Sequence, residues 1–177
     1  MTLRPIITPE NPVLRKKARA VKPADIPALQ TLLEDMLETM RAEPGVGLAA
    51  TQIAVSQRVV VVEYAEPLPD DAPPDTPRPK PALYAVINPE IVERSPEKVT
   101  GVEGCLSVPG YAGEVERHQA ITVKALNRKG KPVKIKAQGW LARIFQHELD
   151  HLDGVLFIDR ATHVWKIKPE DTPVEKE

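Results

Sequence analysis

The segment from Gly139 to Gly154 constrains this chain more than any other. It reads Gly-Trp-Leu-Ala-Arg-Ile-Phe-Gln-His-Glu-Leu-Asp-His-Leu-Asp-Gly, a pattern that predicts a helix of about fourteen residues with the last glycine as its stop. On such a helix His147 and His151 lie one above the other on the same face and can grip one metal ion. Glu148 lies beside them, completing H-E-x-x-H. The segment therefore predicts a metal-binding helix.

Two histidines do not complete a catalytic site, because a tetrahedral ion with one open position needs three protein ligands. One protease class adds a histidine in H-E-x-x-H-x-x-G-x-x-H, but this chain has Phe157 at the final position, which excludes that class. Another class uses a glutamate some twenty residues downstream, and Glu170 has roughly that spacing, although flanking prolines make its segment a poor support for a ligand. The remaining candidate is Cys105, the only cysteine, which is flanked by turn residues. A loop thiolate would complete the site.

The segment Gly45-Val46-Gly47-Leu-Ala-Ala-Thr-Gln52 satisfies the dinucleotide pattern G-x-G-x-x-G/A. Its context does not fit, because that pattern must follow a strand and open a helix, whereas this one follows a predicted helix and leads to a strand. The glycines instead allow backbone to approach a substrate closely. The Gln52 amide could donate to a developing oxyanion, although taken alone it is equally a solvated loop residue.

Apolar residues recur at helical spacing from Pro23 to Glu43, which predicts one amphipathic helix. Runs of β-branched or apolar residues predict short strands at residues 59–62 and 84–87. Alternation at residues 121–125 and 133–137, with turn residues between them, predicts a β-hairpin. We therefore expect an α+β fold in which short, mostly antiparallel sheets cradle the H-E-x-x-H helix and the second helix covers another face.

Proline makes up much of residues 67–81, and the other residues there are mostly charged or small. This composition favours an extended, solvated surface insert. The whole chain, residues 1–177, has the length of one domain, with residues 160–177 as a short C-terminal tail.

Charge and cysteine content limit the possible partners and compartment. Lys and Arg total 24 against 25 Asp and Glu, so the net charge of -1 provides no field for nucleic acid or an anionic membrane. The lone cysteine indicates a reducing compartment. No apolar run reaches membrane length and no secretory h-region begins the chain, so we expect a cytoplasmic protein with a small or peptidic partner.

Three motifs taken together resemble the signature motifs of the peptide deformylase family, in the same order. They are Gly45-Val-Gly-Leu-Ala-Ala-Thr-Gln52, Glu103-Gly-Cys-Leu-Ser107 and Gln146-His-Glu-Leu-Asp-His151. The likeness extends from about Ile6 to about Asp159. It implies a metal-dependent hydrolase that removes the N-formyl group from the initiator methionine of nascent polypeptides. The expected partners are such formylated peptides, with the ribosome as a further candidate.

The resemblance also implies roles for individual residues. Cys105, His147 and His151 would hold the metal, which the family uses as iron(II) and which zinc, nickel or cobalt can replace. Glu148 would be the general acid and base, and Gln52 with the Leu106 backbone N–H would form the oxyanion hole. The peptide would lie extended along two segments of backbone and add a strand. Its contacts would be Gly45, Val46, Gly47, Val108 and Gly110.

The chain departs from the family pattern at two places. Many members have an acidic residue directly before the first glycine of the first motif, where this chain has Pro44. Many also have an arginine shortly after the cysteine motif, whereas here Arg117 is the first arginine. These changes concern peptide contacts. Two other functions remain open from the residues: a metallopeptidase using the same helix, and a non-catalytic protein whose zinc site is closed by a fourth protein ligand.

Overall fold

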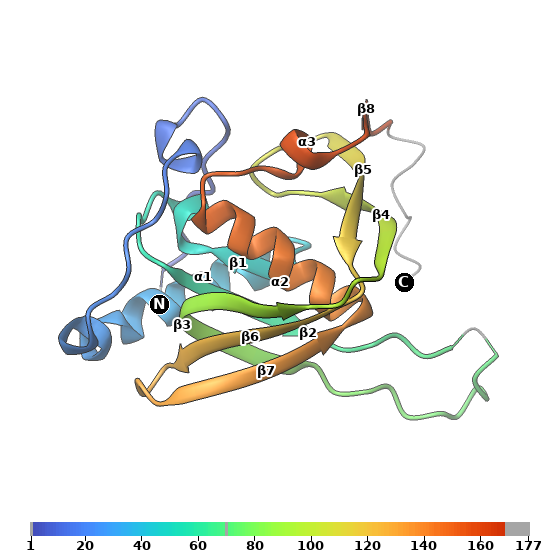
Figure 1. Ribbon diagram of the computed structural model, residues 1–177, viewed down its shortest axis with the longest axis horizontal. Coiled ribbons are helices and arrows are strands. Elements are labelled where there is room, and N and C mark those ends of the chain that lie inside the picture. Colours follow the sequence, from blue (N-terminus) through green and yellow to red (C-terminus); the bar gives the residue numbers. More distant parts are fainter. Residues whose placement is uncertain (1, 70, 169–177) are drawn as a thin grey trace.

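The computed structural model describes residues 2–69 and 71–168, and its strands form two antiparallel sheets (Figure 1). The larger sheet has the order β1-β2-β3-β6-β7 and the smaller one the order β4-β5-β8. The larger sheet consists of β1 (Gly47–Ala49), β2 (Val59–Tyr64), β3 (Ala82–Arg94), β6 (Ala120–Asn127) and β7 (Pro132–Gln138). The smaller sheet consists of β4 (Lys98–Gly104), β5 (Tyr111–His118) and β8 (His163–Lys166).

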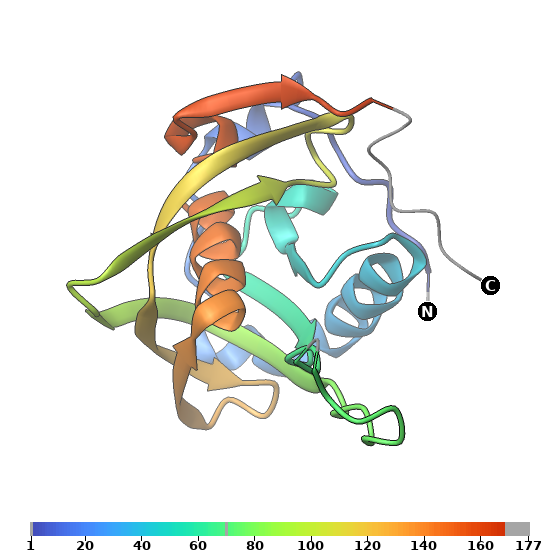
Figure 2. The same cartoon turned by 90° about the vertical axis from the view of Figure 1, so that its right-hand side faces the viewer.

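The α-helices are α1 (Gln30–Ala42), α2 (Gly139–Leu152) and the single turn α3 (Phe157–Arg160). Short 3-10 helices are η1 (Pro12–Arg15), η2 (Pro23–Leu29) and η3 (Ala50–Ile53). Figure 2 shows α2 lying between the two sheets, as expected of an α+β fold with a cradled helix. In the described part of the chain no helix is long and apolar enough to cross a membrane.

Helix α2 presents a different kind of surface to each sheet. Phe145, Leu149 and Leu152 pack into a core with the larger sheet. Arg143 and His147, one turn apart on α2, instead contact Glu103 at the end of β4. Because one face of the helix is apolar and the other is polar and charged, the core fixes how the histidines are aimed.

The position of β2 between two cores explains why its sequence is apolar without alternation. Val60 and Val62 pack in the core that contains α2, whereas Val59 and Val61 pack in the core that contains α1. All four side chains are fully buried. A strand covered by helices on both faces needs apolar residues at every position.

The helix expected over Pro23–Glu43 is only partly correct, because the structure divides this segment into η2 and α1. Pro27 lies inside η2. Proline has no amide hydrogen to donate and its ring clashes with the carbonyl four residues earlier, so the α-helix begins only after it. The pattern of apolar residues runs through both pieces, since residues of both pack in the same core.

The hairpin predicted at residues 121–125 and 133–137 is confirmed as β6 and β7, with Val123 opposite Ile135. Asn127 and Gly130 form the turn, and Gly130 has a φ of 74°. The strand predicted at residues 84–87 extends over all of β3, with two irregularities in its pairing to β6. Strands β1, β4, β5 and β8 were not predicted.

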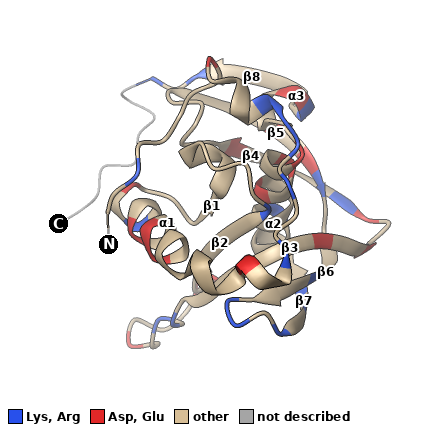
Figure 3. Cartoon of the chain, turned by 90° about the vertical axis from the view of Figure 1, so that its left-hand side faces the viewer, with Lys and Arg blue, Asp and Glu red and all other residues tan. Residues whose placement is uncertain are grey.

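Residues 65–81 connect β2 to β3, and the described ones among them form neither helix nor strand. They project from the end of the larger sheet (Figures 1 and 2). Figure 3 shows Lys and Arg interspersed with Asp and Glu along the ribbon. Of the expected tail, residues 163–166 form β8, and Glu170 lies outside the described residues.

Candidate metal centre

Side chains from α2 and from the loop after β4 meet at one point. The ligand atoms of Cys105, His147 and His151 all lie within 4.8 Å of one another. Sγ of Cys105 is 3.2 Å from Nε2 of His151, and the two imidazole centroids are 5.0 Å apart. One thiolate and two imidazoles form a donor set that suits zinc, iron, nickel and cobalt. The structure thus brings together the three residues that the sequence selected.

Glu148 is buried beside this group and lies against the backbone of β1. A Cβ built on Gly47 would come within 2.5 Å of its Oε1, so only glycine leaves room for the carboxylate. Among the described residues, Oε2 of Glu148 and Nδ1 of His151 are the buried side-chain polar atoms without a hydrogen-bond partner. Burial raises the pKa of the Glu148 carboxyl to about 7. Glu148 therefore has the environment of a group that exchanges protons near neutral pH.

Gln52, which is fully buried in η3, has a fixed orientation. Its Oε1 accepts a hydrogen bond from the Ala49 amide at 2.9 Å. Its Nε2 therefore points the other way, 3.6 Å from Sγ of Cys105 and 3.3 Å from Oγ of Ser107. Since this amide is held at its oxygen, its nitrogen is available as a donor at the thiolate side of the site.

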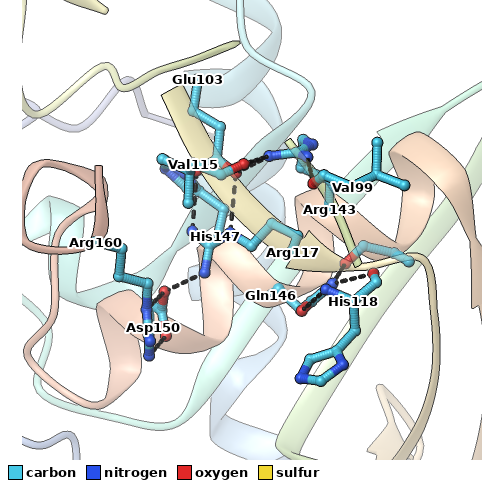
Figure 4. Close-up of polar contacts among 11 residues, drawn as sticks. Val99, Glu103, Val115, Arg117, His118, Arg143, Gln146, His147, Asp150 and Arg160 are labelled. Carbon is cyan, nitrogen blue, oxygen red and sulfur yellow. Dashed lines mark hydrogen bonds and ion pairs between the residues drawn. The ribbon is translucent and has the colours of Figure 1, made fainter. Parts of the chain in front are cut away.

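A buried charged network supports His147 from behind (Figure 4). Nδ1 of His147 is 2.9 Å from Oε2 of Glu103. Arg117 donates to both oxygens of that carboxylate, each at 2.9 Å, and also to Asp150. Arg143 donates to Oε1 at 2.8 Å. A carboxylate on the far nitrogen of a metal-binding histidine fixes the tautomer and aims the near nitrogen at the ion.

The pKa values of the network follow from these contacts. Burial would raise the pKa of Glu103, but hydrogen bonds from His147 and Arg117 outweigh it and lower the pKa to about 2. Burial and the nearby His147 lower the pKa of His151, which keeps its imidazole neutral. Burial likewise opposes the charged form of His147, yet hydrogen bonds to Cys105 and Glu103 raise its pKa to about 10. A bound cation would compete with that proton.

A cavity of about 670 Å³ opens onto the site and is lined by Gln52, Cys105, His147 and Glu148. The residues expected to contact a peptide line it too: Gly45, Val46, Gly47, Val108 and Gly110. Leu106, whose backbone N–H was expected in the oxyanion hole, is also part of the lining. Among the described residues no acceptor pairs with the Leu106 amide. His151 is not part of the lining and is almost fully buried. All the candidate site residues thus lie in or directly behind one cavity.

Sequence reasoning assigned no role to three residues that the structure places behind the site: Glu103, Arg117 and Arg143. Two signals were available. Arg143 precedes His147 by one helical turn and so shares its face. Glu103 stands two places before Cys105, which in an extended segment puts both on one side. Nothing local in the sequence pairs Arg117 with Glu103, because that contact joins two different strands.

Comparisons with known proteins agree on one family. A model described as polypeptide deformylase matches residues 3–166. A protein of Desulforudis audaxviator named peptide deformylase is 45% identical over 168 residues, which cover 95% of this chain and 99% of that protein. A protein of the same name from Natranaerobius thermophilus is 46% identical over 166 residues, covering 94% and 97%.

Solved structures lead to the same family. The crystal structure of peptide deformylase from Thermotoga maritima matches with a TM-score of 0.79 and 41% identity, covering 92% of this chain and 100% of that one. A class I type b peptide deformylase from Acinetobacter baumannii, crystallised with Met-Ala-Ser bound, matches with a TM-score of 0.80 and 39% identity, covering 90% and 98%.

Proposed function

Because the chain belongs to the peptide deformylase family, we propose that the cavity beside α2 is where it removes the N-formyl group from the initiator methionine of nascent polypeptides. One observation carries this assignment. Cys105, His147 and His151 converge beside the buried carboxylate of Glu148, and three of these four residues line a cavity of about 670 Å³, with His151 buried behind them. A metal-dependent hydrolase needs that combination of an ion site, a proton-transferring group and access for the substrate.

We assign Cys105, His147 and His151 as the protein ligands of one divalent ion. The fit rests on the donor set, on the proximity of the ligand atoms and on the carboxylate of Glu103 that holds the far nitrogen of His147. When bound, such an ion supplies a Lewis acid that polarises the formyl oxygen and acidifies water. We propose Fe²⁺ as the ion in the cell, as the family resemblance implies, with zinc, nickel or cobalt able to replace it.

Glu148 is the group that moves protons. Its carboxylate takes a proton from the attacking water and passes it to the nitrogen of the methionine as the carbon–nitrogen bond breaks and formate leaves. Burial against Gly47 favours the protonated form that this second step requires. A single carboxylate can serve both steps because the proton it gains from water in the first step is the proton it donates to the nitrogen in the second.

Gln52 and Leu106 stabilise the negative charge that develops on the formyl oxygen. Nε2 of Gln52 is turned toward the site because its own oxygen is tied to the Ala49 amide. The amide of Leu106 is the second donor. Neutral donors fixed in advance stabilise an oxyanion without reorganising during the reaction.

The peptide lies along β1 and the loop after Cys105. Strand β1 is at the edge of the larger sheet, and Gly45, Val46 and Gly47 line the cavity, which favours an extended peptide added beside this strand. Val108 and Gly110 line the opposite part of the cavity. The Acinetobacter baumannii relative was crystallised with Met-Ala-Ser, a peptide that begins with methionine. We propose the same backbone path here.

We also propose that the protein acts in the cytoplasm on chains emerging from the ribosome. Residues 1–177 would work as one catalytic domain. The balanced charge of the chain gives no reason to add nucleic acid or membrane as partners. Docking to the ribosome, where it occurs, would rest on shape and local contacts.

Hydrolysis of formyl-Met-Ala-Ser, compared with unformylated Met-Ala-Ser, tests the function. We expect formate and intact Met-Ala-Ser from the first peptide and no cleavage of the second. Cleavage of a peptide bond in either substrate would instead support the metallopeptidase. Anomalous scattering at the metal, with a count of its protein ligands, tests the third possibility, since a fourth protein ligand would indicate a closed zinc site.

A further inference from the structure

Arg143 is a buried arginine in the wall of the cavity. Its guanidinium lies 5.5 Å from the centroid of the Trp140 ring on α2, and its hydrogen bonds go to the smaller sheet. Its Nη1 donates to Oε1 of Glu103 and to the Val115 carbonyl, each at 2.8 Å. Its Nη2 donates to the Val99 carbonyl at 2.6 Å. The side chain thus joins α2 to β4 at two points and to β5 at one.

Gly101 is what lets the guanidinium reach this position. A Cβ built on Gly101 would lie 2.8 Å from Cζ of Arg143 and 2.9 Å from its Nη2. The arginine cannot yield easily, because three acceptors hold it in place. Gly101 and Val115 are opposite each other in the pairing of β4 with β5, so the guanidinium lies directly across that pair. Alanine at position 101 would therefore displace the arginine.

Arg143 completes the set of donors around Glu103. Arg117 reaches both carboxylate oxygens from β5, which fixes one side of the group. His147 then bonds Oε2 and Arg143 bonds Oε1, both from α2 and one helical turn apart. Without Arg143, Oε1 would keep only its bond to Arg117. The carboxylate would then lose one of the donors that keep it aligned with His147.

We propose that Arg143 is a positioning residue that holds Glu103 against His147, and that Gly101 serves this role by leaving space for its guanidinium. The inference rests on the proposed function, because it takes His147 to be a metal ligand. It concerns how firmly the ion is held and how its ligands are oriented. Groups behind a metal-binding histidine typically change metal affinity or activity about 10- to 100-fold.

The test uses the full chain loaded with Co²⁺, whose absorption reports the geometry of its ligands. Arg143→Met keeps the length of the side chain and removes its donors. We expect this variant to lose Co²⁺ to a chelator at least about tenfold faster than the wild type, with a shifted cobalt spectrum. Arg143→Lys should recover part of the difference, because an ammonium can bond Glu103 but cannot also reach both carbonyls.

Arg58→Met is the matched control. Arg58 also donates to one carboxylate, that of Asp153, and to two backbone carbonyls, those of Leu152 and Pro89. It makes no hydrogen bond to Glu103. The Arg58→Met variant should therefore lose a comparable number of hydrogen bonds and keep the wild-type rate of cobalt loss. If both variants lose cobalt equally fast, general loosening explains the result and the proposal is wrong. Wild-type behaviour of Arg143→Met would also overturn it.

Gly101→Ala tests the second half of the proposal and remains available if Arg143→Met does not fold. It should reproduce the fast cobalt loss of Arg143→Met although the arginine is still present. The double variant Gly101→Ala with Arg143→Met should be no worse than Arg143→Met alone, since both changes remove the same contact. Additive effects, or wild-type cobalt retention in Gly101→Ala, would contradict the role of Gly101.

Cys105→Ser separates this inference from the proposed function. If it leaves the thiolate-to-cobalt absorption of the loaded protein unchanged, the proposed ligand set fails, whatever Arg143 does. If the absorption disappears in Cys105→Ser while Arg143→Met matches the wild type, only the positioning role fails.

Discussion

Gly47 of β1 and Glu148 of α2 are in such close contact that a Cβ on the glycine would lie 2.5 Å from the Oε1 atom of the glutamate. The two residues come from elements far apart in the chain, and the contact seats the carboxylate at the wall of the cavity. The space left by a single missing methyl group thus accommodates the carboxylate that we propose as the proton-transferring group.

Gly47→Ala should therefore impair the reaction without emptying the metal site. The new methyl group would displace the Glu148 carboxylate, and a misplacement of about 1 Å in a catalytic group can cost roughly 10²-fold in rate. Deformylation and metal content are measured on the same preparation. Full activity with bound metal would show that Glu148 does not need its present position.

Glu148→Ala should retain the metal and lose turnover. We expect a fall of at least about 10²-fold, and more if one carboxylate serves both proton transfers. Rate is measured beside metal content, with Glu148→Gln as the variant of matched size. Loss of metal would mean that Glu148 orients a ligand, and substantial activity in a fully metallated variant would remove it from the mechanism.

Cys105→Ser should lower metal content sharply, because the thiolate supplies one of the proposed protein ligands and a serine hydroxyl is a much weaker donor for these ions. Elemental analysis after dialysis is the measurement. His118→Ala is a suitable control, since that histidine bonds the Ser95 carbonyl and lies outside the ligand group. Near-full metal retention in Cys105→Ser would exclude the cysteine as a ligand.

Replacing residues 67–81 with a short turn should leave the chemistry intact. The segment joins the ends of β2 and β3, which already pair as far as Tyr64 and Ala82. Its composition favours solvated chain over packed structure. The kinetic constants for formyl-Met-Ala-Ser are compared before and after the replacement. A large fall in turnover at unchanged metal content would mean that the segment takes part in substrate binding.

Asp35 should make stability depend on pH in the acid range. Hydrogen bonds from the Thr2 amide and the Arg4 side chain lower the pKa of Asp35 below its ordinary value of 3.8. A carboxyl with a lowered folded-state pKa stabilises the fold above the ordinary value, and the benefit is lost as the pH falls through the folded-state value.

Urea unfolding of the wild type and of Asp35→Asn, followed from about pH 6 down to about pH 3, measures this effect. The wild type should be the more stable protein at the upper end, and the difference should shrink at the lower end. If the difference in stability between the two proteins stays constant with pH, the ionised form of Asp35 does not stabilise the fold.

Local spacing along the chain was enough to predict several parts of this protein. Four-residue spacing placed His147 and His151 on one face of a helix, and the structure has that helix at Gly139–Leu152. Two-residue alternation and a turn produced the hairpin of β6 and β7. The same local reading selected Cys105 and Gln52 as candidates. It failed at Pro27, where one proline divides a helical pattern into a 3-10 and an α segment.

Contacts between distant segments became visible only in the folded chain. Gln52 approaches Cys105 across 53 positions of sequence, and Arg143 bonds Glu103 across 40. The strands missed from the sequence include β1, with 3 residues, and β8, with 4. Such short strands exist because a partner strand supplies their hydrogen bonds, and local composition carries no record of that partner. Contacts such as Gly47 with Glu148 and Gly101 with Arg143 depend on the space between packed elements, which no spacing rule along the chain encodes.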